Sequence, residues 1–287
     1  MGKIAAVLLA LALLLLLVAC GEEPFTEAGL RALLEAQVTQ EILAFEYGDY
    51  DGDGVCEAFA FVGEEQQPDV DESYKGEIWF VSAKGAQALE AYQNGYGGLI
   101  NVYTFGENKF AVLNQYATTG GYVSVWGVHR GKPCNENISG VGGGMRQLDD
   151  KNFTLYHSTY DFDETDGIAT GHTWKDYWFY WDGKAFHEYG GVKITEEQLR
   201  KCGGAAEALD AILANGDTIG EIFYRGNGMI NVNHFRACGS SRSNYFTTLQ
   251  LNGAKIIFNE VEDNGGIYLP ALAPDIAVYP ELPEIFN

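Results

Sequence analysis

From Glu41 onward the chain consists of short runs in which apolar and polar residues alternate, separated by polar turns, and this pattern predicts β-strands. Four of the runs are rich in aromatic or β-branched residues and lead into a turn that contains a glycine: Gly85, Gly131, Gly183 and Gly253. These glycines follow one another at intervals of 46, 52 and 70 residues. The first two intervals are similar enough to indicate a repeating structural unit.

Residues 195–216 account for the longer last interval, because they carry the signals of an inserted helix. Thr195 and Gln198 have the spacing of a capping box, and Ile194 and Leu199 flank it as a hydrophobic staple does. An Asn-Gly pair at the end of the segment supplies the left-handed residue at which helices often stop. Without these 22 residues the last interval shortens to 48, in line with the others.

A second set of markers recurs in phase with the first. Phe59, Phe110, Phe153 and Met229 each begin a strand after a polar turn. Every unit therefore consists of a strand, a turn, a strand, a loop, a strand, a glycine turn and a strand. Four strands in roughly 40–50 residues is the size of one β-propeller blade, which buries its faces only when blades stack. The sequence predicts an all-β fold: a small β-propeller-like array of about four four-stranded units, with an N-terminal helix and one inserted helix.

A β-sandwich built from the same hairpins is the alternative architecture. In a sandwich each strand exposes one face, so apolar and polar residues alternate cleanly along it. The run Trp178-Phe179-Tyr180-Trp181 instead places large rings on both faces of its strand. That arrangement favours the propeller-like array, in which neighbouring units cover both faces.

Carboxylates recur at every second position between the first two predicted strands. Asp49, Asp51 and Asp53 would give side-chain oxygens to a cation, Val55 a backbone carbonyl and Glu57 a closing carboxylate. The glycines between them allow the chain to curl around an ion. Ca²⁺ prefers six to eight oxygen ligands at roughly 2.3–2.6 Å. The pattern predicts one structural Ca²⁺ site at the tip of a β-hairpin, and a calcium-dependent binding tip is the alternative.

This segment is not an EF-hand, because the twelfth position counted from Asp49 is Ala60 and not the glutamate that closes such a loop. The stretch Asp49–Glu57 instead resembles the D-x-D-x-D-G-x-x-D/E calcium loop of FG-GAP/VCBS-type propeller repeats, with Glu57 at the last acidic position. The resemblance implies a β-propeller with calcium in its first unit. The other three units have short turns without an acidic loop, so the expectation is a single ion.

The N-terminus has the features of a secretory signal. Lys3 precedes an apolar run, Ile4–Val18, and small residues follow it. These 15 residues fall short of the ~20 that a membrane-spanning helix needs. The stretch Leu17-Val18-Ala19-Cys20 resembles a bacterial lipobox, which implies cleavage before Cys20 and a lipid on that cysteine.

The sequence accordingly predicts a lipoprotein signal peptide over residues 1–19, a tether over 20–25, and a single β-propeller-like ectodomain over 26–287. The ectodomain begins with a helix that Thr26 caps. Its apolar residues fall on one face: Leu30, Leu33, Leu34 and Val38. The predicted location is extracytoplasmic, with a lipid anchor in the cell membrane.

Charge narrows the choice of partners. Removal of residues 1–19 takes away Lys3, their one charged residue, and changes the formal net charge from −22 to −23. So acidic a protein is repelled by phosphate backbones, which argues against nucleic acid as a partner. Four cysteines follow Cys20, an even number that permits disulfides outside the cytoplasm in any of three pairings: Cys56, Cys134, Cys202 and Cys238.

No catalytic residues stand out in the sequence. The histidines show no metal-ligand spacing, and no serine has the strand–Gly-x-Ser-x-Gly–helix setting of a nucleophile elbow. A second acidic cluster, Asp161–Gly167, matches no cation loop in its spacing. The sequence therefore predicts a non-enzymatic, lipid-anchored binding or scaffolding protein, with the membrane and a glycan or protein ligand as partners. The alternative is a cell-surface glycan-acting hydrolase or carbohydrate-binding protein; a hydrolase of this kind needs two close carboxylates across a cleft.

Overall fold

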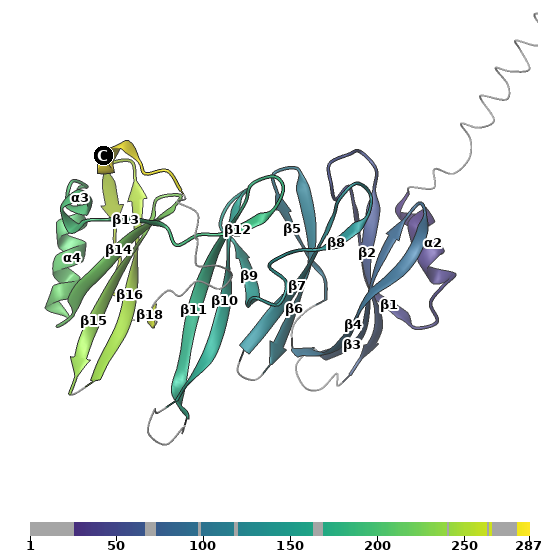
Figure 1. The fold of residues 1–287 in the computed structure, drawn as a ribbon, viewed down its shortest axis with the longest axis horizontal. Helices are drawn as coiled ribbons and strands as arrows, with labels where there is room; N and C mark the ends of the chain where they lie inside the picture. The colour runs from purple at the N-terminus through teal and green to yellow at the C-terminus, as the bar shows by residue number, and fades with distance from the viewer. Residues whose placement is uncertain are drawn as a thin grey trace, which may run out of the picture. The chain divides into compact units, whose positions relative to one another are not determined.

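The structure is a computed structural model that describes residues 26–66, 73–96, 99–117, 120–162, 169–239, 241–262, 264–265 and 280–287. The predicted signal peptide and tether, with Cys20, lie outside the described residues. The chain divides into two compact units, one comprising Met1–Gln115 with Ser124–Glu136 and the other Tyr116–Val123 with Asn137–Asn287. Within both units most of the described chain forms antiparallel strands, which Figure 1 colours from purple to yellow along the sequence.

The strands form four successive groups of about four strands each, which confirms the predicted propeller-like array. The first group is β1 (Glu41–Gly48), β2 (Glu57–Glu65), β3 (Ser73–Ser82) and β4 (Gly85–Tyr96). The second is β5 (Asn101–Phe105), β6 (Asn108–Ala117), β7 (Gly120–Val128) and β8 (Pro133–Asn135). The third is β9 (Gly143–Gln147), β10 (Asn152–Phe162), β11 (Ala169–Trp181) and β12 (Phe186–Glu188). The fourth is β14 (Thr218–Gly226), β15 (Met229–Cys238), β16 (Ser241–Asn252) and β17 (Lys255–Ile257).

Hydrogen bonds link strands beyond these groups. Pairing of β4 with β6 joins the first two groups into one eight-stranded sheet, and β5 pairs with β6 at its side. Two short strands extend the fourth group, because β13 (Val192–Ile194) pairs with β14 and β18 (Asn264–Gly265) pairs with β16. The third group remains a four-stranded sheet in the order β12-β11-β10-β9.

The glycine turns that revealed the repeat have a common backbone geometry. Gly85, Gly131, Gly183 and Gly253 have positive φ angles of 124°, 66°, 94° and 61°. Each lies where the third strand of its group turns into the fourth. Glycine adopts positive φ without the steric cost that a β-carbon brings, so the turn geometry accounts for the spacing seen in the sequence.

Helix α2 (Glu27–Glu35) covers one face of the first group. It begins as predicted, with the Thr26 hydroxyl accepting the N–H of Gly29 at 3.1 Å. Its buried Leu30 and Leu34 pack against small residues of β2: Ala58, Ala60 and Val62. The other face of β2 carries Phe59, which belongs to a second core shared with strands of the second group. Strand β2 is therefore covered on both faces, as stacked sheets require.

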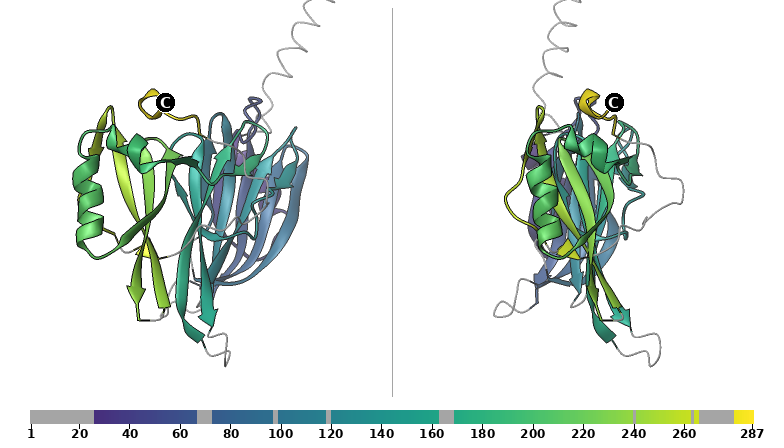
Figure 2. Two further views of the ribbon diagram at one scale, coloured as in Figure 1. Left: turned by 60° about the vertical axis from the view of Figure 1, so that its left-hand side comes forward. Right: turned by 90° about the vertical axis from the view of Figure 1, so that its left-hand side faces the viewer.

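The inserted segment 195–216 forms two short helices, α3 (Glu196–Arg200) and α4 (Ala205–Ala214). The predicted capping box of Thr195 and Gln198 is present at the start of α3. The helices are separated by Gly203 and Gly204, of which the second has a φ of 82°. Figure 2 shows α4 lying along one face of the fourth group, where its apolar residues pack with those of the strands: Ala208, Leu209, Ile212, Ile222, Ile230, Val232 and Leu249.

Three further points from the sequence concern the cysteines, the second acidic cluster and membrane-spanning helices. Cys56, Cys134 and Cys202 carry free thiols. The second acidic cluster falls mostly on residues 163–168, which lie outside the described part of the chain. Within the described ranges, no helix combines the length and the apolar character that a bilayer span requires.

Candidate functional site

The acidic segment connects β1 to β2, as the sequence predicts for the tip of a β-hairpin. Gly48 at the end of β1 pairs with Glu57 at the start of β2. Between them Gly52 and Gly54 have φ angles of 73° and 86°. A residue with a β-carbon would be strained at either position, so the tight curl of the loop depends on these glycines.

Three carboxylates converge inside this curl. Asp49, Asp51 and Asp53 each offer an oxygen, and these oxygens lie within 4.8 Å of one another. Asp49 accepts the N–H groups of Gly52 at 2.8 Å and Gly54 at 3.0 Å. Asp53 accepts the N–H of Val55 at 2.7 Å. These bonds hold the carboxylates in place, and the cluster could hold a cation.

Glu57 adds a fourth carboxylate, buried at the base of the loop. Its side chain is 1% exposed, and its Oε2 has no hydrogen-bond partner; Oδ1 of Asp51 is buried and unpaired in the same way. Burial raises the pKa of Glu57 to about 7, and the charge of Asp51 adds to this, whereas the N–H of Tyr50 opposes it by donating to the carboxylate. Buried polar atoms rarely lack a partner, and these two oxygens could contact a cation held by the loop.

The loop also contacts two turns of the second strand group. Asp51 Oδ2 accepts the N–H of Gly131, in the turn between β7 and β8, at 3.1 Å. The carbonyl of Tyr50 accepts the N–H of Lys109, at the start of β6, at 2.9 Å. The first and second groups therefore meet at the acidic loop, within the same compact unit.

The predicted ligands thus differ in how the structure places them. The three aspartates come together, and Glu57 lies close enough for their charges to raise its pKa. Val55 is 39% exposed, and its N–H donates to Asp53.

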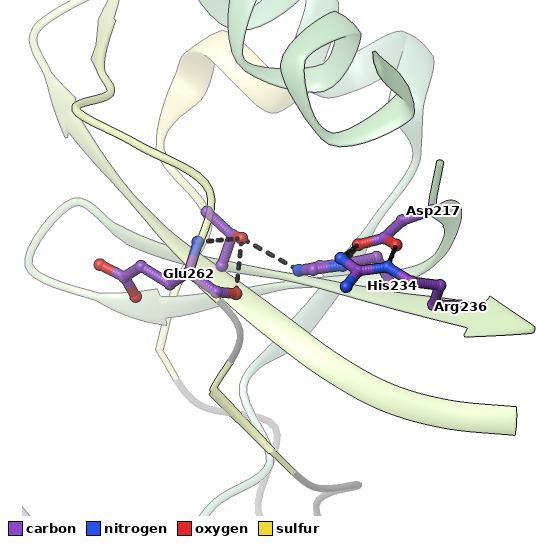
Figure 3. Close-up of polar contacts among 5 residues, drawn as sticks. Asp217, His234, Arg236 and Glu262 are labelled. Carbon is purple, nitrogen blue, oxygen red and sulfur yellow. Dashed lines mark hydrogen bonds and ion pairs between the residues drawn. The ribbon is translucent and has the colours of Figure 1, made fainter. Parts of the chain in front are cut away.

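A buried polar network in the fourth group escaped the sequence analysis. Nδ1 of His234 lies 2.6 Å from Oδ2 of Asp217, and Arg236 donates to both oxygens of the same carboxylate at 2.6 and 3.1 Å. On the other side of the ring, Nε2 of His234 lies 3.0 Å from the hydroxyl of Thr247. Figure 3 shows the carboxylate of Asp217 facing His234 and Arg236, with Glu262 at the far end of the network. Burial raises the pKa of Asp217, but the bonds from Arg236 and His234 outweigh it and hold that pKa below its usual range.

The order carboxylate, imidazole, hydroxyl matches that of a nucleophilic triad, but this network is closed to substrate. The side chains of Asp217 and His234 are fully buried, and Thr247 is 0% exposed. The Thr247 hydroxyl also lies 3.1 Å from both the N and the O of Glu262. The network therefore ties β15 and β16 to the segments on either side of them. The sequence contains one signal of this network. Side chains alternate between the two faces of β15, so His234 lies on the same face as the buried Ile230 and Val232.

A cavity of about 390 Å³ lies beside the turn between β3 and β4. Its lining combines apolar, polar and basic residues: Phe80, Ser82, Lys84, Gly85, Ala86, Gln87, Gly131, Lys132 and Pro133. No carboxylate lines this cavity.

Comparison with known proteins yields little. No protein-family model matches the chain, and no curated protein matches it. Among solved structures, a puromycin-hydrolyzing peptidase of Mycobacterium tuberculosis is similar over 77% of this chain and 39% of its own, with 11% identity and a TM-score of 0.25. The chain thus spans well under half of that peptidase, and a similarity at this level carries no argument about fold or activity.

Proposed function

We propose that the chain is a lipid-anchored, extracytoplasmic binding or scaffolding protein whose acidic loop holds one structural calcium ion. The observation that carries the proposal is the convergence of Asp49, Asp51 and Asp53 beside the unpaired buried oxygen of Glu57. All four carboxylates supply hard oxygen donors, which bind Ca²⁺ in preference to softer metals. The carbonyl of Val55 completes the set that the FG-GAP/VCBS-like pattern implies.

The role proposed for the ion is to fasten two strand groups together. Without a cation, four carboxylates in one loop repel one another, and this repulsion opposes the contacts of Asp51 with Gly131 and of Tyr50 with Lys109. A bound Ca²⁺ neutralises the repulsion and fixes the loop against both turns. The first and second groups then form a rigid platform, on which exposed loops can present binding residues.

Two features of the described residues favour a binding role over catalysis. The cavity beside β3 and β4 has no carboxylate, and the His234 network is inaccessible. The test is to immobilise the full chain in detergent with Ca²⁺ and incubate it with cell-envelope glycans and proteins. We expect retention of a glycan or a protein without new reducing ends in the glycan. Shortened glycan chains would support the hydrolase instead and overturn the binding role.

The proposed lipid anchor at Cys20 leads to a separate prediction. Replacement of Cys20 by serine removes the sulfur that the lipobox-like stretch would acylate, so the Cys20→Ser protein should leave the membrane fraction. Acyl chains contribute roughly 0.8 kcal/mol per buried CH₂, and two or more of them hold a protein firmly at a membrane. The measurement is detergent phase partition of the wild-type and Cys20→Ser chains, with Cys56→Ser as the matched cysteine control. Equal partition of wild type and Cys20→Ser would contradict the lipid anchor.

A further inference from the structure

The hairpin of β7 and β8 gathers three different metal-binding side chains on one face. Gly127 pairs with Cys134, and the N–H of Glu136 donates to the carbonyl of Val125 at 2.8 Å. Since side chains alternate between the faces of a strand, residues 125, 127 and 129 of one arm face the same way as 134 and 136 of the other. His129, Cys134 and Glu136 therefore project from the same side of the hairpin.

Gly127 makes room for these side chains at the centre of that face. A β-carbon placed on Gly127 would lie 2.5 Å from Oε1 of Glu136 and about 3.0 Å from the ring of Phe110. The missing side chain leaves a recess, and the carboxylate of Glu136 occupies it with only 6% of the residue exposed. Nε2 of His129 lies 2.9 Å from Oε1 of Glu136. One donor atom from each of His129, Cys134 and Glu136 lies within 4.8 Å of the others.

We propose that His129, Cys134 and Glu136 form a zinc site, separate from the calcium loop. Zn²⁺ binds imidazole nitrogen, thiolate sulfur and carboxylate oxygen, with Zn–S near 2.3 Å and Zn–N near 2.0–2.1 Å. A tetrahedral ion with these bond lengths separates its donors by roughly 3.3–3.5 Å. The donors already lie within about 1.5 Å of that spacing, so modest side-chain rotations complete the site. The mixed nitrogen, sulfur and oxygen set distinguishes it from the all-oxygen calcium loop.

The exposure of His129 is consistent with such a site. The His129 side chain is 43% exposed, which gives the ion a path from solvent and leaves the fourth position to water or an external ligand. When the ion binds, the Cys134 thiol releases its proton to solvent, and His129 binds through Nε2 with its proton on Nδ1.

The first experiment titrates the full chain in detergent with Co²⁺, a spectroscopic stand-in for Zn²⁺. Cobalt at this site should show thiolate-to-cobalt charge-transfer absorption, and Zn²⁺ should displace it in a one-to-one ratio. Cys134→Ser should abolish that absorption. His129→Ala and Glu136→Gln should each weaken zinc binding by 10- to 100-fold or more. Removal of a residue that only supports a metal ligand already costs 10- to 100-fold in affinity.

Matched variants separate this site from others in the chain. Cys56→Ser keeps the three donors and should leave the cobalt spectrum unchanged. Asp53→Asn alters the acidic loop and should leave zinc binding within about twofold of wild type. A cobalt spectrum without thiolate absorption, or one that survives in Cys134→Ser, would overturn the zinc site.

A second experiment needs no variant and so does not depend on whether a substituted chain folds. The wild-type chain is treated with iodoacetamide with and without Zn²⁺, and the alkylation of each cysteine is followed by peptide mass spectrometry. Zinc should slow alkylation of Cys134 by more than tenfold and leave that of Cys56 unchanged. Equal protection of both cysteines, or of neither, would show that zinc does not bind at Cys134.

Discussion

Replacing Asp217 with alanine should lower the free energy of unfolding by about 3–5 kcal/mol, the cost of removing one partner from a buried ion pair. The side chain of Asp217 is fully buried, and its two oxygens accept bonds from His234 and from Arg236. Without the carboxylate, these partners lose a charged acceptor that water cannot replace in the interior. Urea denaturation of wild type and Asp217→Ala, followed by circular dichroism, measures the difference.

The matched control is Asp210→Ala, in the inserted helix α4. Asp210 also faces an arginine, Arg200, at 3.7 Å, but its side chain is 68% exposed. Exposed ion pairs contribute roughly 0–1 kcal/mol, so this variant should lose little stability. If Asp217→Ala cost no more than Asp210→Ala, the buried network would not be a stabilising element of the fourth group.

The effect of Asp217→Ala should depend on pH in a defined direction. The pKa of Asp217 lies below its ordinary value of 3.8 in the folded chain. The stability that the ionised carboxylate contributes is therefore fully present above the unfolded pKa and is lost as pH falls through the folded pKa. The difference between wild type and Asp217→Ala should be largest near neutral pH and shrink in strong acid.

The repeat was predictable from the sequence because it depends on local backbone requirements. Gly85, Gly131, Gly183 and Gly253 occupy turns with positive φ, and such positions leave a mark in any single sequence. The capping box at Thr195 is equally local, since its two hydrogen bonds span three residues. The break between α3 and α4 is local as well, because Gly204 has a φ of 82°, but the capping box and the Asn-Gly end of the segment by themselves indicate one continuous helix.

In the candidate site, too, the sequence predicts the local features but not the contacts between distant residues. The curl of Asp49, Asp51 and Asp53 is local, so spacing alone predicts that they converge. The bond from Gly131 to Asp51 joins residues 80 positions apart, and no local pattern indicates it. The network of His234 is missed for the same reason, because its partners come from three separate segments. Distant partners become visible only when the strands are placed in register.

The acidic loop should make the stability of the chain depend on both calcium and pH. In the metal-free chain the pKa of Glu57 is raised to about 7 from an ordinary value of 4.5. A carboxyl whose folded pKa is raised contributes stability below its unfolded pKa and loses it as pH rises through the folded pKa. With chelator present, the free energy of unfolding should therefore fall as the pH rises from about 5 to about 8. Bound Ca²⁺ favours the ionised carboxylate and should remove this fall.

Three variants test the calcium and pH dependence, with thermal melting in Ca²⁺ and in chelator as the measurement. Saturating Ca²⁺ at 100 times its dissociation constant should stabilise the wild type by about 2.7 kcal/mol, and Asp51→Ala should lose this gain. Glu57→Gln has no carboxyl to titrate, so its stability in chelator should stay level across the same pH range. Glu65→Gln, at the exposed end of the same strand, should behave as wild type in both respects. Identical melting of the wild type in Ca²⁺ and in chelator would contradict a structural ion, because four carboxylates gathered in one hairpin would then need no cation to hold them there.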